Sequence, residues 1–131
     1  MREKVARYDM ATALGYRPAG VTIVNLEKLG TISAADGLDY FVVPYKGEIV
    51  HAQMSLSSTG GTSGTNTAEL NLNGVAQFTG SIDWNASVKY KDLGVRAIKV
   101  KKGDILHLDI NAVATSGSPA DMRLKLLLAL S

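Results

Sequence analysis

Strict alternation of apolar and polar residues recurs along this chain, and it restricts the chain to β-structure. In residues 50–57 and 106–112 every second residue is apolar, which is the pattern of a strand with one buried face. Residues 122–126 alternate in the same way, whereas residues 127–130 are apolar on both faces. We therefore expect the last strand to be covered on both sides near its end, by the body of the protein or by a neighbouring subunit.

Turn signals separate these segments from shorter predicted strands at residues 21–24, 38–43, 68–72, 75–78 and 97–100. Asn73-Gly74 predicts a type I′ hairpin turn, because both central residues of that turn need a positive φ. Residues 101–104 predict a second tight turn. A helical pattern is confined to residues 2–14.

The number and spacing of these strands predict an all-β fold. We expect an antiparallel β-sandwich of jelly-roll type with about eight strands and a short N-terminal arm. The arm would comprise residues 1–20, and the sandwich domain residues 21–131.

Composition limits the class of protein. The chain has 131 residues, 46% of them hydrophobic and 20% charged, which fits one globular domain. It has no cysteine, so packing rather than disulfides must hold the fold. No signal-peptide pattern and no membrane-length apolar run occurs, which predicts a soluble protein without a membrane partner.

The positive charge is concentrated near the start of the chain. Residues 1–20 carry four basic and two acidic side chains, and residues 21–131 carry ten of each. The basic residues of the body are scattered, apart from Lys99, Lys101 and Lys102 beside a turn. Nucleic-acid binders usually concentrate basic residues on one face, so we expect no nucleic-acid partner.

Two segments are predicted to be loops. Residues 57–67 contain only Ser, Thr, Gly and Asn, and such a run offers no apolar surface to bury. We expect an exposed, mobile loop, either a long hairpin connection or a variable recognition loop. Residues 114–121 are a similar loop between the last two strands.

No motif assembles an active site, and we expect a protein that is not an enzyme and holds no cofactor or metal. His51 and His107 occupy polar positions of alternating strands, and Asp109 lies on the same face as His107. A His107/Asp109 pair is possible, but the pattern favours solvent-facing polar residues. Four other carboxylates could meet in space: Asp36, Asp39, Glu48 and Glu69.

Two aromatic residues have alternative interpretations. Trp84 and Tyr90 could form a platform on which a sugar ring stacks. As the only tryptophan, Trp84 is also suited to anchor the core or an interface.

Two segments carry a family resemblance. Residues 100–113, a Lys-Lys-Gly-Asp turn into an alternating strand, and residues 41–52, an apolar run, a Pro/Gly turn and a strand, resemble jelly-roll domains of tailed-bacteriophage virion proteins. These include capsid decoration (cement) proteins and fibre tips. The resemblance implies a structural role in the virion, commonly as a trimer, and it transfers no catalytic residue.

The leading hypothesis is therefore a decoration protein on the capsid surface, made in the host cytoplasm and bound to the major capsid protein or another virion protein. The alternative is a receptor- or carbohydrate-binding module of a fibre or tail. The N-terminal segment is interpreted as an arm that docks on a shell or a neighbouring subunit, or else as an ordinary first strand with a frayed end. The candidate partner-binding residues are Arg2, Lys4, Arg7, Tyr8, Tyr16 and Arg17.

Overall fold

The computed structural model describes residues 20–115 and 117–130. They form eight strands: β1 (Gly20–Thr31), β2 (Ala35–Val42), β3 (Gly47–Ser55), β4 (Thr65–Leu72), β5 (Val75–Asp83), β6 (Tyr90–Val100), β7 (Ile105–Ala112) and β8 (Ala120–Leu130). Each of the eight predicted strands is present. Within these residues there is no helix, and hence none long and apolar enough to cross a membrane. The proposed arm and the helical pattern of residues 2–14 lie outside the described residues.

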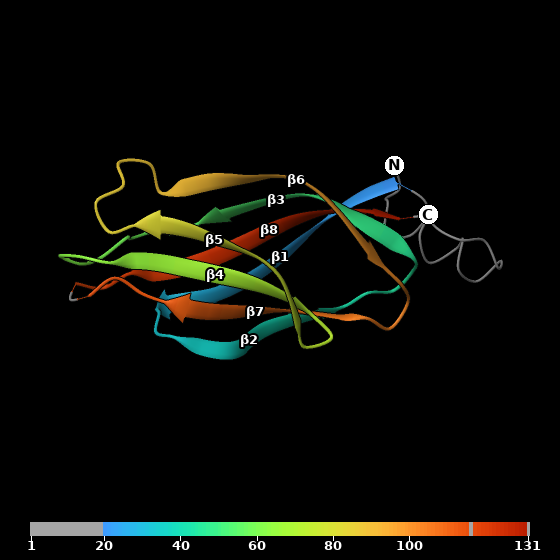
Figure 1. Cartoon of the computed structure of the whole chain (residues 1–131), viewed down its shortest axis with the longest axis horizontal. Helices are drawn as coiled ribbons and strands as arrows, with labels where there is room; N and C mark the ends of the chain where they lie inside the picture. The colour runs from blue at the N-terminus through green and yellow to red at the C-terminus, as the bar shows by residue number, and fades with distance from the viewer. Residues whose placement is uncertain (1–19, 116, 131) are drawn as a thin grey trace.

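The strands form two antiparallel sheets with the orders β1-β8-β3-β6 and β2-β7-β4-β5. Within them the first strand pairs with the eighth, the second with the seventh, the third with the sixth and the fourth with the fifth. The chain thus follows the path of one long antiparallel hairpin wrapped into two packed layers, as Figure 1 shows. This order is that of a jelly roll, and the predicted β-sandwich is confirmed.

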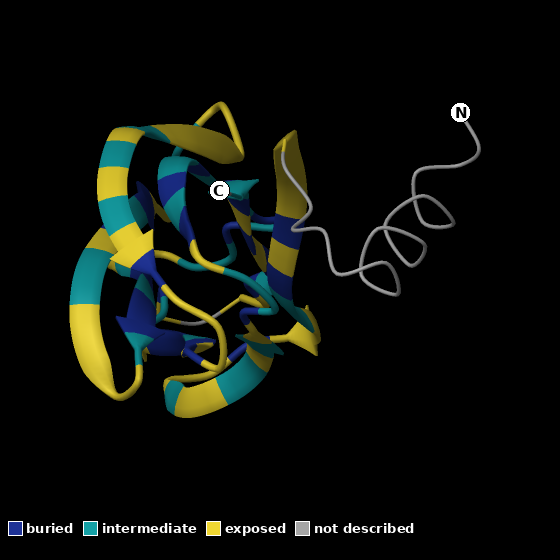
Figure 2. Cartoon of the chain, turned by 90° about the vertical axis from the view of Figure 1, so that its right-hand side faces the viewer, coloured by how far each residue is buried: buried dark blue, intermediate teal, exposed yellow. Residues whose placement is uncertain are grey.

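The core lies between the two sheets and is built from alternate residues of the strands. In β8, Met122, Leu124, Leu126 and Leu128 are all at most 1% exposed. The intervening residues face outward, which gives the strands the bands of buried and exposed residues seen in Figure 2. The alternation in the sequence therefore arises because each strand has one buried face and one outer face.

The antiparallel order gives the sandwich two distinct ends. The β1–β2, β3–β4, β5–β6 and β7–β8 loops lie at one end, here called the loop end. The other connections lie at the opposite end, together with the start of β1 and the end of β8, where Gly20 pairs with Leu130. We call this the lysine end, because its turns contain Lys46, Lys101 and Lys102.

The β4–β5 connection is the predicted hairpin turn. Asn73 and Gly74 have φ angles of 53° and 86°, both in the left-handed region that a type I′ turn requires. The Asn73 side chain also bonds the neighbouring β6–β7 turn: its Oδ1 accepts from the Ile105 amide at 2.9 Å, and its Nδ2 donates to Asp104 at 3.0 Å.

The expectation that residues 57–67 form an exposed loop is wrong in part. Asn66 already belongs to β4 and is fully buried, and Thr59 is buried as well. The Asn66 amide donates to the carbonyls of Thr59 (3.0 Å) and Ile82 (3.3 Å) and accepts from the amide of Ala114 (2.9 Å). One side chain therefore joins the β3–β4 loop, strand β5 and the β7–β8 loop, which local composition could not indicate.

The β3–β4 and β7–β8 loops also pack directly on each other. Isolated bridges link Ser58 to Ala120 and Ser63 to Thr115. At Gly61, with a φ of 64°, a Cβ would come within 2.8 Å of the Thr115 carbonyl oxygen, so only glycine lets the two loops approach this closely. The two predicted loops are thus one interlocked structure.

Replacing Asn66 with alanine is expected to destabilise the fold by about 2–4 kcal/mol, because it leaves buried backbone groups unpaired. The thermal midpoint should fall by roughly 10 °C. The exposed Asn85, at the same end, supplies the control: Asn85→Ala should leave the midpoint nearly unchanged. Equal midpoints for both variants in calorimetry would contradict this role of Asn66.

Candidate docking surfaces

The lysine end contains an open cleft of about 670 Å³. Its lining combines lysine side chains with apolar residues from the ends of β6 and β8: Lys46, Gly47, Glu48, Asn73, Lys99, Val100, Lys101, Asp104, Ala129 and Leu130. Lys99 is highly exposed and lies 3.5 Å from Glu48, a contact too long and too solvated to neutralise its charge firmly. The cleft therefore presents positive charge over an apolar floor.

Asp104 organises the turn beside this cleft. Its carboxylate accepts hydrogen bonds from Asn73 Nδ2 at 3.0 Å and from the Lys101 backbone amide at 2.9 Å. These two bonds, first that from Asn73, hold the pKa of Asp104 below its ordinary value of 3.8. The aspartate thus keeps its charge in the structure and fixes the backbone from which Lys101 projects.

A second surface is an apolar row across the outer face of the β1-β8-β3-β6 sheet. Register places Val21 beside Ala129, Ile23 beside Leu127, and Leu127 in line with His51 and Val95. Val21, Ile23 and Val95 are 50%, 56% and 81% exposed. We call these six residues the outer apolar row; five of them are apolar, and the sixth, His51, pairs with Asp92 at 2.7 Å.

The last strand therefore differs from the expectation that both its faces are covered. Leu126 and Leu128 point into the core, but Leu127 and Ala129 are only half-buried on the outer face. Among the described residues, only the neighbouring strands β1 and β3 flank this outer face. That a neighbouring subunit covers the outer face of β8 stays a prediction.

The outer face of the other sheet carries a polar network instead. His107 Nδ1 lies 3.0 Å from Asp109 Oδ1, and Asn71 Nδ2 donates both to Asp109 Oδ2 and, at 2.7 Å, to Glu69. Asn111 donates to Glu69 at 2.8 Å, and the Gly37 amide donates to Asp109. The possible His107/Asp109 pair is therefore present, and Asp109 is 5% exposed rather than solvent-facing.

This network places two carboxylates opposite each other, since Glu69 and Asp109 are register partners on β4 and β7. The Asn71 amide donates to both carboxylates, and the Asn111 amide donates to Glu69. Alternating polar residues on both strands were a usable signal in the sequence. Glu69 and Asp109 lie together because β4 pairs with β7, and this pairing could not be predicted from local sequence patterns.

The other candidate carboxylates do not converge. Asp39 accepts from the Glu27 amide at 2.9 Å at the sheet edge, and Glu48 lies at the lysine end beside Lys99. His51 on β3 pairs with Asp92 on β6 at 2.7 Å, in the other sheet. In the described part of the chain, no group of three or more His, Cys, Asp or Glu side chains is placed to hold a metal ion.

The aromatic candidates lie at the loop end. Tyr90 is 61% exposed and lines a shallow cleft of about 260 Å³ together with Asp83 and Asn85. Trp84 is 37% exposed, and its carbonyl accepts from the buried Thr59 hydroxyl at 2.8 Å. Both rings are therefore accessible; Trp84 lies against the β3–β4 loop, and Tyr90 is the first residue of β6.

The residues proposed for the arm lie outside the described residues: Arg2, Lys4, Arg7, Tyr8, Tyr16 and Arg17. The structure shows where that segment joins the body, at Gly20 beside the lysine end. Sequence reasoning had already grouped Lys99, Lys101 and Lys102. It missed Lys46, which belongs to a different turn and reaches the same cleft only through the fold.

No protein-family model matches the chain, and no curated protein sequence matches it. Conclusions about its function therefore depend on its fold and its surfaces.

Asp104→Asn is expected to lower the thermal midpoint, and the loss should depend on pH. Because the pKa of Asp104 is lowered on folding, its charge stabilises the fold at pH values above about 4 and stops doing so as the pH falls through the folded pKa. The midpoint difference between wild type and variant should be constant from neutral pH to about pH 5 and shrink below about pH 4.

Thermal unfolding followed by circular dichroism across this range tests the expectation. Asp36→Asn, which removes one negative charge from an exposed position, is the control for net charge. A difference between wild type and Asp104→Asn that is as large at pH 3 as at neutral pH would contradict the role assigned to the carboxylate.

Proposed function

We propose that this chain is a structural virion protein, a capsid decoration protein that binds the outer surface of a shell and stabilises it. The observation that carries the proposal is the outer apolar row, which runs from the edge strand where residues 1–19 join the body. Isolated exposed apolar residues are ordinary, but five apolar residues in register on one sheet face, with His51 among them, are typical of an interface. The jelly-roll order, common among viral capsid domains, supports the same class of protein.

The mechanism of such a protein is mass action. Each copy that binds the assembled shell but not its separated parts lowers the free energy of the assembled state. Apolar area that such a contact removes from water contributes about 25 cal/mol for each Å². Residues 1–19, with their tyrosines and arginines, would add contacts of the types enriched at interface hot spots.

We further propose that the outer apolar row joins copies of this chain, most simply in a trimer. The edges of the sheets are poorly suited to association, because each edge strand takes part in a register shift. The sheet face therefore remains as the route for self-association.

A second function, recognition of a receptor or a carbohydrate, is favoured by one observation. The exposed Tyr90 ring and the neighbouring polar side chains of Asp83 and Asn85 border a shallow cleft at the loop end. Aromatic rings beside hydrogen-bonding groups are the usual components of a sugar site. Such a function is compatible with attachment through the opposite end.

Ile23→Glu is expected to weaken self-association at least about tenfold, because burying one such side chain contributes roughly 1.5–3 kcal/mol. Sedimentation velocity should show a trimer for the wild type at micromolar concentrations and smaller species for the variant. Val88→Glu is the matched control, since Val88 is 54% exposed but lies at the loop end. A wild type that is monomeric at every concentration, or a loss of association in both variants, would contradict an interface on the outer apolar row.

The decoration role predicts that the chain is a stoichiometric component of virus particles purified from cells that carry its gene. Recombinant protein added to particles that lack it should bind and raise the temperature at which they release DNA. A variant lacking residues 1–17 should keep its own thermal transition but bind fewer copies per particle. Absence of the chain from purified particles in mass spectrometry would refute the role.

A further inference from the structure

The folded body is electrically polarised, although its net charge is close to zero. Four of its lysines gather at the lysine end, Lys46, Lys99, Lys101 and Lys102, against the two carboxylates of Glu48 and Asp104. This end therefore has a net charge of +2, and the rest of residues 20–131, with six basic and eight acidic side chains, has a net charge of −2.

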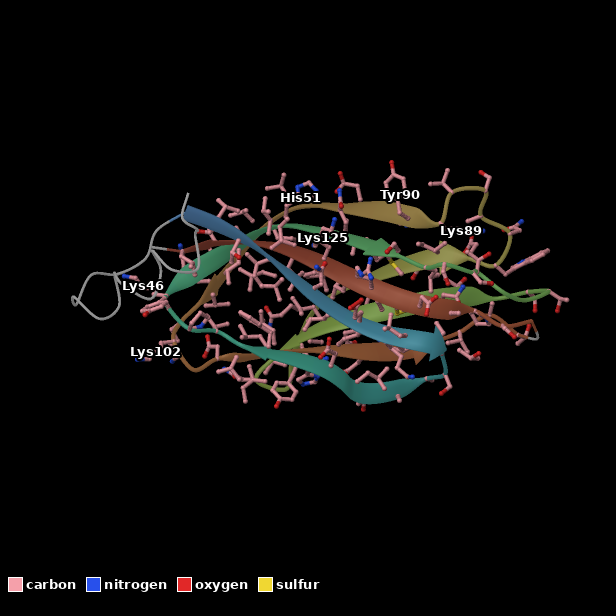
Figure 3. The ribbon with its side chains drawn as sticks, turned by 180° about the vertical axis from the view of Figure 1, so that it is seen from behind. Lys46, His51, Lys89, Tyr90, Lys102 and Lys125 are labelled. Atoms are coloured by element: carbon pink, nitrogen blue, oxygen red, sulfur yellow. The ribbon has the colours of Figure 1, made fainter. Side chains whose placement is uncertain are left out.

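The positions of the labelled lysines in Figure 3 illustrate this arrangement. Lys46 and Lys102 lie at the end where the chain enters and leaves the sandwich, and Lys89 lies toward the opposite end near Tyr90. Gly20, the first described residue, lies at this end, and residues 1–19, which lie outside the described part of the chain, carry a net charge of +2 in the sequence. Topology thus gathers charges that are spread over the sequence.

The geometry points to this end as the docking site for an acidic protein surface. The carboxylate side chains of that surface would enter the lysine-lined cleft. The inference rests on the proposed attachment role and names the chemistry of the partner. Val100, Ala129 and Leu130 form the apolar part of the cleft, and Ala129 continues into the outer apolar row. A partly apolar centre with a charged rim is the usual anatomy of a protein–protein interface.

Nucleic acid fits this end less well. The described part of the end contains lysine but no arginine, and arginine is the residue that recognises phosphate through paired hydrogen bonds. Glu48 and Asp104 lie in the same cleft and would repel a continuous phosphate backbone. Discrete carboxylates on a protein can be positioned beside the lysines and away from these two groups.

The test uses the full chain and two triple variants that change net charge equally. Lys99→Glu, Lys101→Glu and Lys102→Glu reverse the lysine end, and the control reverses Lys28, Lys89 and Lys125 elsewhere on the body. The probe is fluorescent poly-L-glutamate, and a DNA duplex of equal total charge is the comparison. Binding is measured by anisotropy at low and moderate salt, because screening weakens exposed charge pairs.

Wild type is expected to bind poly-L-glutamate, the lysine-end variant to lose about tenfold or more in affinity, and the control to lose less than about threefold. No binding by the wild type, or equal losses in both variants, would overturn the inference. Tighter binding of DNA than of poly-L-glutamate by the wild type, lost in the lysine-end variant, would overturn it in favour of nucleic acid.

Thermal melts control for folding, and the corresponding Lys→Gln triple replaces the Glu triple if the latter does not fold. The assay needs no virus particle. Absence of the chain from particles would therefore refute the proposed function while leaving the poly-L-glutamate result intact. Presence of the chain in particles without binding of poly-L-glutamate would refute only the chemistry assigned to the partner.

Discussion

Strand β8 is the element on which the rest of the sandwich depends. It pairs with β1 on one side and with β3 on the other, and it contributes four fully buried side chains to the core. Neither of those pairings is local, because β8 is the last strand in the sequence. The sheet therefore stays open until the C-terminal residues insert, and a fold dominated by such distant contacts is expected to form slowly. The same strand ends beside Gly20 and Gly47, so the stability of the lysine end depends on this insertion.

The edge strands of both sheets are irregular, which leaves a sheet face rather than a sheet edge available to a partner. The pairings of all four edge strands contain register shifts, for example between Lys28 and Thr31 in β1. Near this shift the Asp39 carboxylate accepts from the Glu27 amide, which satisfies a donor that another strand would need for pairing. Bulges and satisfied donors prevent edge-to-edge addition. Among the described residues nothing comparable shields the outer apolar row, and this contrast supports the proposal that it is an interface.

The strands could be predicted from sequence, and the sites largely could not. Alternation identified three strands, short segments between turn signals identified the other five, and Asn73-Gly74 identified its turn, because all these signals are local. Asn66 was assigned to an exposed loop, since its buried role depends on Ile82 and Ala114, which are distant in sequence. The meeting of Glu69 with Asp109 and of Lys46 with Lys99 likewise required the strand order. Local patterns therefore predict elements, whereas surfaces arise from long-range pairing.

The polarity of the molecule follows from this strand order. In an antiparallel fold with an even number of strands, both ends of the chain lie at the same end as the even-numbered connections, and here those connections carry the lysines. The N-terminal segment, which has a net charge of +2 in the sequence, precedes Gly20 at this same end. Under the proposed function, one end then engages the shell, while the opposite end displays Trp84, Tyr90 and the interlocked loops outward.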